Sequence, residues 1–75
     1  MAEAYAVVLL ASTNRALRAE KILTAAGLPC SLIPVPRTLS SDCGVCVRIE
    51  RADRARAEEA LAAAGLSFDE IHEVR

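Results

Sequence analysis

Aromatic side chains are scarce in this chain, which has one Phe, one Tyr and no Trp among its 75 residues. Proteins that bind nucleic acid usually combine an excess of positive charge with aromatic rings on which bases stack. Here nine basic residues stand against ten acidic ones, and the formal net charge is −1. Because both features are missing, we expect no nucleic-acid partner.

Long hydrophobic runs and a basic leader are also missing. The apolar run near the start covers only residues 4–11, whereas a membrane-spanning helix needs about 20 residues. Position 3 is acidic, unlike the basic start of a signal peptide. We therefore expect a cytoplasmic protein with no membrane partner and with reduced thiols. Three cysteines are an odd number, which excludes a fully paired disulfide framework.

The chain has few groups that could ligate a metal. Cys43 and Cys46 form a single Cys-x-x-Cys pair, and His72 is the one histidine. A structural zinc site needs four ligands, and no second cysteine pair is available to complete it. We therefore expect no metal site and no cofactor.

What the chain does have is an internal repeat. The segment "RAEKILTAAGL" at 18–28 aligns with "RAEEALAAAGL" at 56–66. Each copy carries an apolar stripe with the period of a helix. The stripe residues are Ala16, Ala19, Leu23 and Ala26 in the first copy and Ala57, Leu61 and Ala64 in the second.

Capping residues set the expected helix ends. Ser12, Thr13 or Asn14 can cap the first helix, and Asp53 can cap the second. Both copies end in Gly-Leu, and a glycine there suits the left-handed residue that follows many helices. The expected positions are Gly27 and Gly65.

Four segments read as strands, one before and one after each helix. They are "YAVVLL" (5–10), "CSLIPV" (30–35), "CGVCVR" (43–48) and "FDEIHEV" (68–74). The order β-α-β-β-α-β predicts an α+β fold of the ferredoxin-like kind, a four-stranded antiparallel sheet with two helices on one face. We expect one domain over residues 1–75, built from two pseudo-repeated halves at about 4–36 and 43–75.

Alternation along the third strand assigns its faces. Val45, Val47 and Ile49 should pack under the helices, and Cys46 should point to the other face. We place three residues of the first strand on that same open face: Ala6, Val8 and Leu10. An apolar open face usually finds a partner, so we expect a homodimer through it or docking onto a larger enzyme.

The connection between the second and third strands carries the first candidate site. In a ferredoxin-like sheet, residues 36–44 lie at the end where the first strand passes to the first helix, close to Ser12 and Thr13. A thiol facing a helix N-terminus meets the positive end of the dipole, which favours the thiolate. Cys43 precedes the flexible Gly44, and Arg37 would add positive charge. Cys43 is therefore either a reactive thiol or a small residue in a turn.

Cys46 allows two interpretations that the residues do not separate. It can be a resolving partner for Cys43, because Cys-x-x-Cys spacing is common in thiol redox proteins. It can equally be a small apolar side chain on the open face of the sheet.

Three segments carry a resemblance to a known family: "STNRALRAEKIL" (12–23), "PVPRTLSSDCG" (34–44) and "GLSFDEIHEV" (65–74). The chain resembles the small bacterial selenium/sulfur carrier-like proteins. This resemblance implies that Cys43 is the carrier position, and that other residues belong to the same motif: Pro34, Pro36, Arg37, Ser40, Ser41 and Gly44. Position 46 is often not a cysteine in that family, so a Cys-x-x-Cys mechanism is not implied.

The resemblance implies a carrier rather than a stand-alone enzyme. Cys43 would take sulfur or selenium from a donor such as a cysteine desulfurase and pass it to an acceptor protein. Ser41, Thr13 and backbone amides of the first helix would stabilise the charged chalcogen by hydrogen bonding. Two alternatives stay open: a thiol-disulfide redox module that uses Cys43 and Cys46, and a non-catalytic interaction domain.

Overall fold

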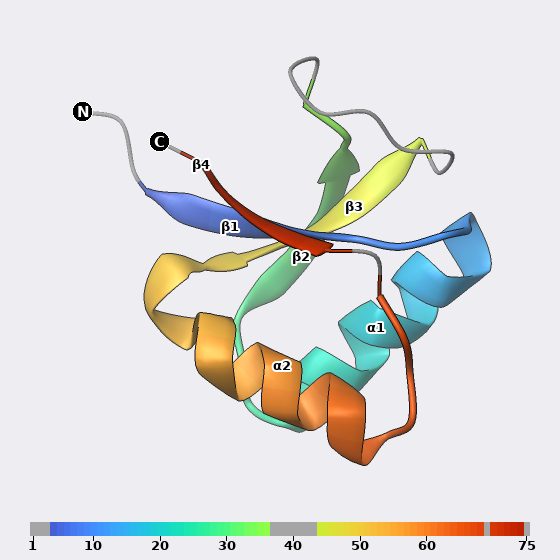
Figure 1. Ribbon diagram of the computed structural model, residues 1–75, viewed down its shortest axis with the longest axis vertical. Helices are drawn as coiled ribbons and strands as arrows, with labels where there is room; N and C mark the ends of the chain where they lie inside the picture. Colours follow the sequence, from blue (N-terminus) through green and yellow to red (C-terminus); the bar gives the residue numbers. More distant parts are fainter. Residues whose placement is uncertain (1–3, 37–43, 69, 75) are drawn as a thin grey trace.

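Each copy of the repeat folds into a helix, and both helices lie on the same side of a four-stranded sheet (Figure 1). The structure is a computed structural model and describes residues 4–36, 44–68 and 70–74. The expected α+β fold and the order β-α-β-β-α-β are confirmed. In chain order the elements are β1 (Tyr5–Leu9), α1 (Thr13–Ala25), β2 (Cys30–Pro34), β3 (Val45–Glu50), the 3-10 turn η1 (Arg51–Asp53), α2 (Arg54–Ala63) and β4 (Glu70–Val74).

The Gly-Leu ending of the repeat forms the same C-terminal cap on both helices. Gly27 and Gly65 have φ values of 81° and 74°, which side-chain-bearing residues rarely adopt. The Leu28 N–H donates to the Leu23 carbonyl oxygen at 3.0 Å, and the Leu66 N–H donates to that of Leu61 at 3.0 Å. These are the bonds of the Schellman motif. The expected glycine positions are confirmed.

The helix N-termini differ from each other. Ser12 caps α1, and its Oγ accepts a hydrogen bond from the Arg15 N–H at 3.2 Å. Asp53 directly precedes α2 as expected, but its side chain makes no capping bond. Its carboxylate instead lies 4.0 Å from the Arg56 guanidinium. The 3-10 turn that links β3 to α2 gives Asp53 a ψ of 4°, so it lacks the extended backbone of Ser12.

The strands pair in the order β2-β3-β1-β4, and all neighbours are antiparallel. Val8 pairs with Val47 on one side and with Ile71 on the other, and Val47 also pairs with Leu32. Residues opposite one another share a face, so this row of side chains points to the helices.

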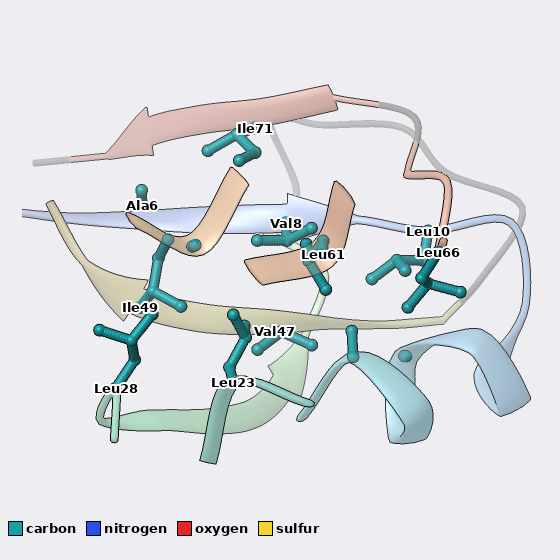
Figure 2. Packing of buried hydrophobic residues seen from close by; sticks show 13 residues of the cluster. Ala6, Val8, Leu10, Leu23, Leu28, Val47, Ile49, Leu61, Leu66 and Ile71 are labelled. Carbon is teal, nitrogen blue, oxygen red and sulfur yellow. The ribbon is translucent and has the colours of Figure 1, made fainter. Parts of the chain in front are cut away.

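The main core lies between the sheet and the two helices (Figure 2). Ala16, Ala19 and Leu23 of α1 are fully buried, and so are Ala57 and Leu61 of α2. The expected stripes are therefore confirmed over these residues. Ala26 and Ala64 were wrongly included, because each is the C-cap residue that directly follows its helix and lies exposed.

The face assignment of β1 was wrong. Ala6, Val8 and Leu10 belong to the helix-covered core, whereas Val7 and Leu9 share the other face with Cys46. A one-residue change in register moves every side chain of a strand to the other face. Since β1 is an inner strand with apolar residues on both faces, its sequence contains no alternation that shows which set faces the helices.

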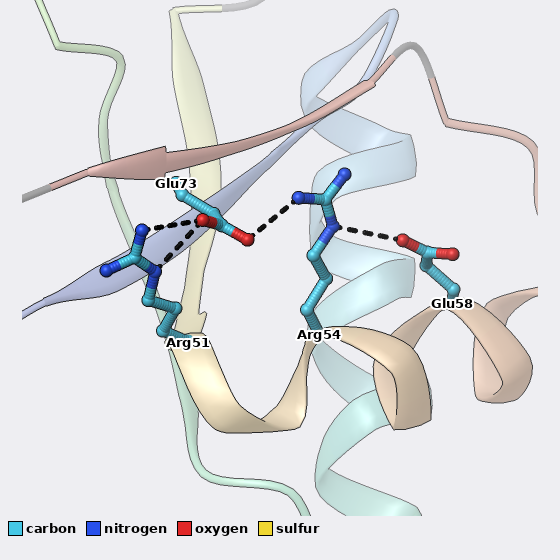
Figure 3. A network of polar contacts seen from close by, with 4 residues as sticks. All are labelled: Arg51, Arg54, Glu58 and Glu73. Carbon is cyan, nitrogen blue, oxygen red and sulfur yellow. Dashed lines mark hydrogen bonds and ion pairs between the residues drawn. The ribbon is translucent and has the colours of Figure 1, made fainter.

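A network of charged side chains fixes the edge strand β4 to the start of α2 (Figure 3). The Glu73 carboxylate accepts hydrogen bonds from Arg51 Nε and Nη2 at 3.0 and 2.7 Å, and from Arg54 Nη1 at 2.9 Å. Arg54 Nε also donates to Glu58 at 3.2 Å. The bonds from Arg51 and Arg54 hold the pKa of Glu73 below its ordinary value of 4.5.

Candidate functional site

The strand order brings both ends of the 36–44 connection to the sheet edge where β1 passes to α1. β1 and β2 run in the same direction, because each is antiparallel to β3. Val45 pairs with Pro34 and lies two residues before Val47, which pairs with Val8. The ends of the connection are therefore level with the end of β1. There the Val35 N–H donates to the Gly44 carbonyl oxygen at 3.2 Å.

Half of the expected site lies outside the described residues. Cys43, Arg37, Ser40 and Ser41 all belong to the undescribed segment 37–43. The expected approach of Cys43 to the start of α1 therefore stays a prediction. Gly44 is described; it is exposed and directly precedes β3.

The N-terminus of α1 lies at the same sheet edge as the ends of this connection. Ser12 is half-buried and its Oγ is used in capping, while Thr13 is the exposed first residue of the helix. No acidic residue occupies the first turn of α1. The positive end of the helix dipole is therefore not neutralised by a carboxylate on its own first turn.

Cys46 is completely buried on the helix-free face of the sheet. It clusters with Val7 and Leu9, and the half-buried Ile33 and Val35 pack against this group. Its Sγ lies 4.0 Å from the Pro34 carbonyl oxygen. The expected position on the face opposite the helices is confirmed, and the thiol has no contact with solvent.

Cys30 lies at the other end of the sheet and is half-buried. Its Sγ is 3.4 Å from Thr24 Oγ1 and 3.5 Å from the Glu20 carbonyl oxygen. It also lines an open hollow of about 810 Å³, together with Tyr5, Arg48 and others. This hollow is formed where β1 and β2 begin and β3 ends, which is the opposite end of the sheet from Val35 and Gly44.

The described ranges contain no group of three or more His, Cys, Asp or Glu side chains that could hold a metal ion. His72 Nε2 lies 2.9 Å from the Glu70 carboxylate. Among the described residues, no helix has both the length and the apolar character to cross a bilayer.

The exposed face of α1 carries residues that the sequence interpretation did not single out. Arg15, Arg18 and Lys21 are all exposed, and Leu17 lies among them with 42% of its surface accessible. The excess of positive charge on this helix could have been found in the sequence, because α1 has three basic residues and one acidic residue, Glu20. We name this surface, made by Arg15, Leu17, Arg18 and Lys21, the basic face of α1.

Comparison with known proteins gives one family. A family model with the description "Putative Se/S carrier protein-like" matches residues 5–73. No curated protein and no solved structure matches the chain. The match covers both helices and reaches all four strands of the sheet.

Proposed function

Because the chain belongs to the Se/S carrier protein-like family, we propose that it carries sulfur or selenium on Cys43 as a cytoplasmic accessory protein rather than a stand-alone enzyme. The observation behind this proposal is the family match, which covers nearly the whole chain. We also propose that the fold is ferredoxin-like, with two split β-α-β halves. The strand order, read from the other edge as β4-β1-β3-β2, supports that assignment.

The proposed chemistry is sulfur transfer between thiols. The Cys43 thiolate attacks the terminal sulfur of a persulfide on the donor, such as a cysteine desulfurase. The Cys43–sulfur bond forms, the sulfur–sulfur bond of the donor breaks, and the donor cysteine leaves as a thiolate. The persulfide proton stays with the transferred sulfur, so no external oxidant or reductant is needed. Transfer to the acceptor repeats the same exchange, and a selenosulfide would follow the same steps.

The environment at the end of β1 supports this chemistry. A thiolate or a persulfide anion is stabilised by nearby positive charge and by hydrogen-bond donors. The N-terminus of α1 offers both at the edge where the 36–44 connection ends. In the proposal, Thr13, Ser41 and backbone amides donate hydrogen bonds to the carried anion, Arg37 adds positive charge, and Ser12, Ser40 and Gly44 support the loop.

The burial of Cys46 gives the redox alternative no support. A resolving thiol must reach the sulfur that it attacks. Cys46 lies within β3 and is fully buried, in a cluster with Val7 and Leu9 of β1. We therefore assign the carrier role to Cys43 alone.

The test is to incubate the protein with a cysteine desulfurase, pyridoxal phosphate and cysteine, and then to measure its intact mass. We expect wild type to gain the mass of one sulfur atom, and the gain to disappear after reduction with a thiol. The matched variants are Cys43→Ser, which should gain nothing, and Cys46→Ala, which should still gain sulfur. No gain on wild type, or an equal gain on Cys43→Ser, would contradict the proposal.

A further inference from the structure

The basic face of α1 is a continuous surface on the helix side that faces away from the sheet. Arg18 follows Arg15 by three positions, Lys21 follows Arg18 by three and Leu17 by four. Side chains three or four positions apart are neighbours on a helix. The opposite side of α1 is in the core, where Ala16, Ala19 and Leu23 are fully buried.

The basic side chains of this face have no oppositely charged partner among the described residues. Arg15, Arg18 and Lys21 have side chains that form no ion pair with any residue in the described ranges. The other described arginines differ. Arg51 and Arg54 bind Glu73, Arg56 lies near Asp53, and Arg48 lies over the Tyr5 ring. Within the described ranges, the arginine and lysine side chains without an ion pair or ring contact are therefore those of α1.

Helix stability does not account for these charges either. Basic residues stabilise a helix near its C-terminus and destabilise it near its N-terminus, where the dipole is positive. Arg15 lies in the first turn of α1, which has no acidic residue, and the last turn has no basic residue. The arrangement is the reverse of the one that favours the helix. Sequences that break such a local rule tend to do so at functional surfaces.

Leu17 adds an apolar centre to this face. It is the one large hydrophobic side chain that is exposed in the described part of the chain. Leu17 lies one turn before Lys21, and the half-buried Glu20 is its other neighbour on that turn. An exposed apolar side chain beside unpaired cations suits a protein-docking surface, in which the anchor gives affinity and the charges steer the encounter.

We propose that the basic face of α1 docks an acidic protein surface on the sulfur or selenium donor, with Leu17 entering an apolar recess of that partner. This proposal rests on the carrier function above. The helix begins at the sheet edge where the 36–44 connection has its described ends, so a partner bound along its first turns lies on the same side of the molecule as Val35 and Gly44.

A protein fits this face better than the other polyanions do. A helix that binds a membrane surface inserts a broad apolar face, but the apolar side of α1 is occupied by the core. Single-stranded nucleic acid needs aromatic stacking, and the basic face of α1 has no aromatic residue.

The test compares two sulfur sources for the same carrier. One source is a persulfidated cysteine desulfurase, and the other is inorganic polysulfide, which needs no docking. In the Arg18→Gln/Lys21→Gln variant, we expect transfer from the desulfurase to slow by about tenfold and transfer from polysulfide to keep its wild-type rate. The Leu17→Ser variant should likewise slow transfer from the desulfurase and leave transfer from polysulfide at the wild-type rate. The wild-type rate with the desulfurase should fall as salt rises from about 0.05 to 0.5 M, and that of the double variant should fall less.

The matched control is Ala55→Glu/Ala62→Glu, which makes the same change in net charge at exposed positions of α2. It should transfer sulfur from the desulfurase at close to the wild-type rate. Circular dichroism of each variant confirms that it is folded before rates are compared.

Each remaining outcome overturns one proposal. If the double variant takes sulfur from the desulfurase as fast as wild type, or if the control slows equally, the docking proposal is wrong and the carrier function stands. The docking proposal is also wrong, and the carrier function stands, if wild type accepts sulfur from polysulfide but not from the desulfurase. If Cys43 accepts sulfur from neither source, the carrier function itself fails. Binding of wild type to phosphatidylglycerol vesicles that is lost in the double variant would show that the face serves a membrane instead.

Discussion

At the scale of single residues, the structure describes one of the two cysteines of the Cys-x-x-Cys pair. Cys46 is fixed in β3 with no exposed surface, whereas Cys43 precedes the strand and lies outside the described residues. Cys46 also sits in an apolar cluster with Val7 and Leu9. The spacing of the pair suggested shared chemistry, but the environment of Cys46 is that of a packing residue.

This difference predicts an order of alkylation. In the folded protein, iodoacetamide should modify Cys46 at least about tenfold more slowly than Cys30, because a buried thiol reacts only when the structure opens. Cys30 is half-buried and lines an open hollow, so it is the internal reference. Peptide mass spectrometry over a time course gives both rates. In denaturant the two rates should converge, and equal rates in the native protein would show that Cys46 is accessible after all.

At the scale of elements, the two halves of the repeat are alike at their helix C-termini and different elsewhere. Both helices end in the same glycine-centred cap, which places Leu28 and Leu66 in the core. Among the residues that the structure describes, the ion-pair network lies in the second half, where Glu73 of β4 binds Arg51 and Arg54. An edge strand has hydrogen-bonded neighbours on one side only, so these contacts supply part of its attachment.

The network predicts a pH dependence of stability. The pKa of Glu73 is lowered in the folded protein, so its charged form stabilises the fold fully above the ordinary value of 4.5. That contribution should disappear as the pH falls from 4.5 through the lowered pKa. Denaturant unfolding of wild type and Glu73→Gln should therefore give a stability difference that shrinks in this acidic range.

The control for this prediction is Glu59→Gln on α2, because Glu59 is exposed and forms no ion pair with the described residues. Its effect on stability should be smaller than that of Glu73→Gln at neutral pH. A Glu73→Gln effect that does not change with pH would mean that the carboxylate charge is not what holds β4.

At the scale of the whole molecule, the homodimer through the helix-free sheet face stays a prediction, with a corrected set of residues. The centre of that face is Val7, Leu9 and Cys46, all buried within the single chain. A dimer would therefore use the half-buried side chains around them, which are Tyr5, Ile33, Val35 and Val74.

Sedimentation equilibrium over a range of protein concentrations tests this association. Because the available side chains are only half-buried, we expect a weak dimer that forms at high concentration. Val74→Glu should shift the equilibrium to the monomer, whereas a glutamate at the exposed Ala55 should not. A monomeric mass at every concentration would rule out the dimer.

Local patterns in the sequence were sufficient for the elements and their order. The Gly-Leu endings predicted the helix C-termini, because Gly27 and Gly65 take a backbone conformation that favours glycine. Alternation in residues 45–50 predicted the faces of β3, since its inward side chains are apolar and two of its outward ones, Arg48 and Glu50, are charged. The position of Cys43 as the carrier residue came from the resemblance, and it stays a prediction.

Tertiary structure decided what local patterns could not encode. The faces of β1 depend on its pairing with β3 and β4, because "YAVVLL" is apolar on both sides. The burial of Cys46 depends on Val7 and Leu9, which the same register places beside it. The basic face of α1 could be recognised only from the structure. There the other described arginines contact a carboxylate or an aromatic ring, whereas the basic side chains of this face form no ion pair with the described residues. The sequence by itself determined the elements and the candidate thiol, whereas long-range pairing determined which side chains are covered and which are free to meet a partner.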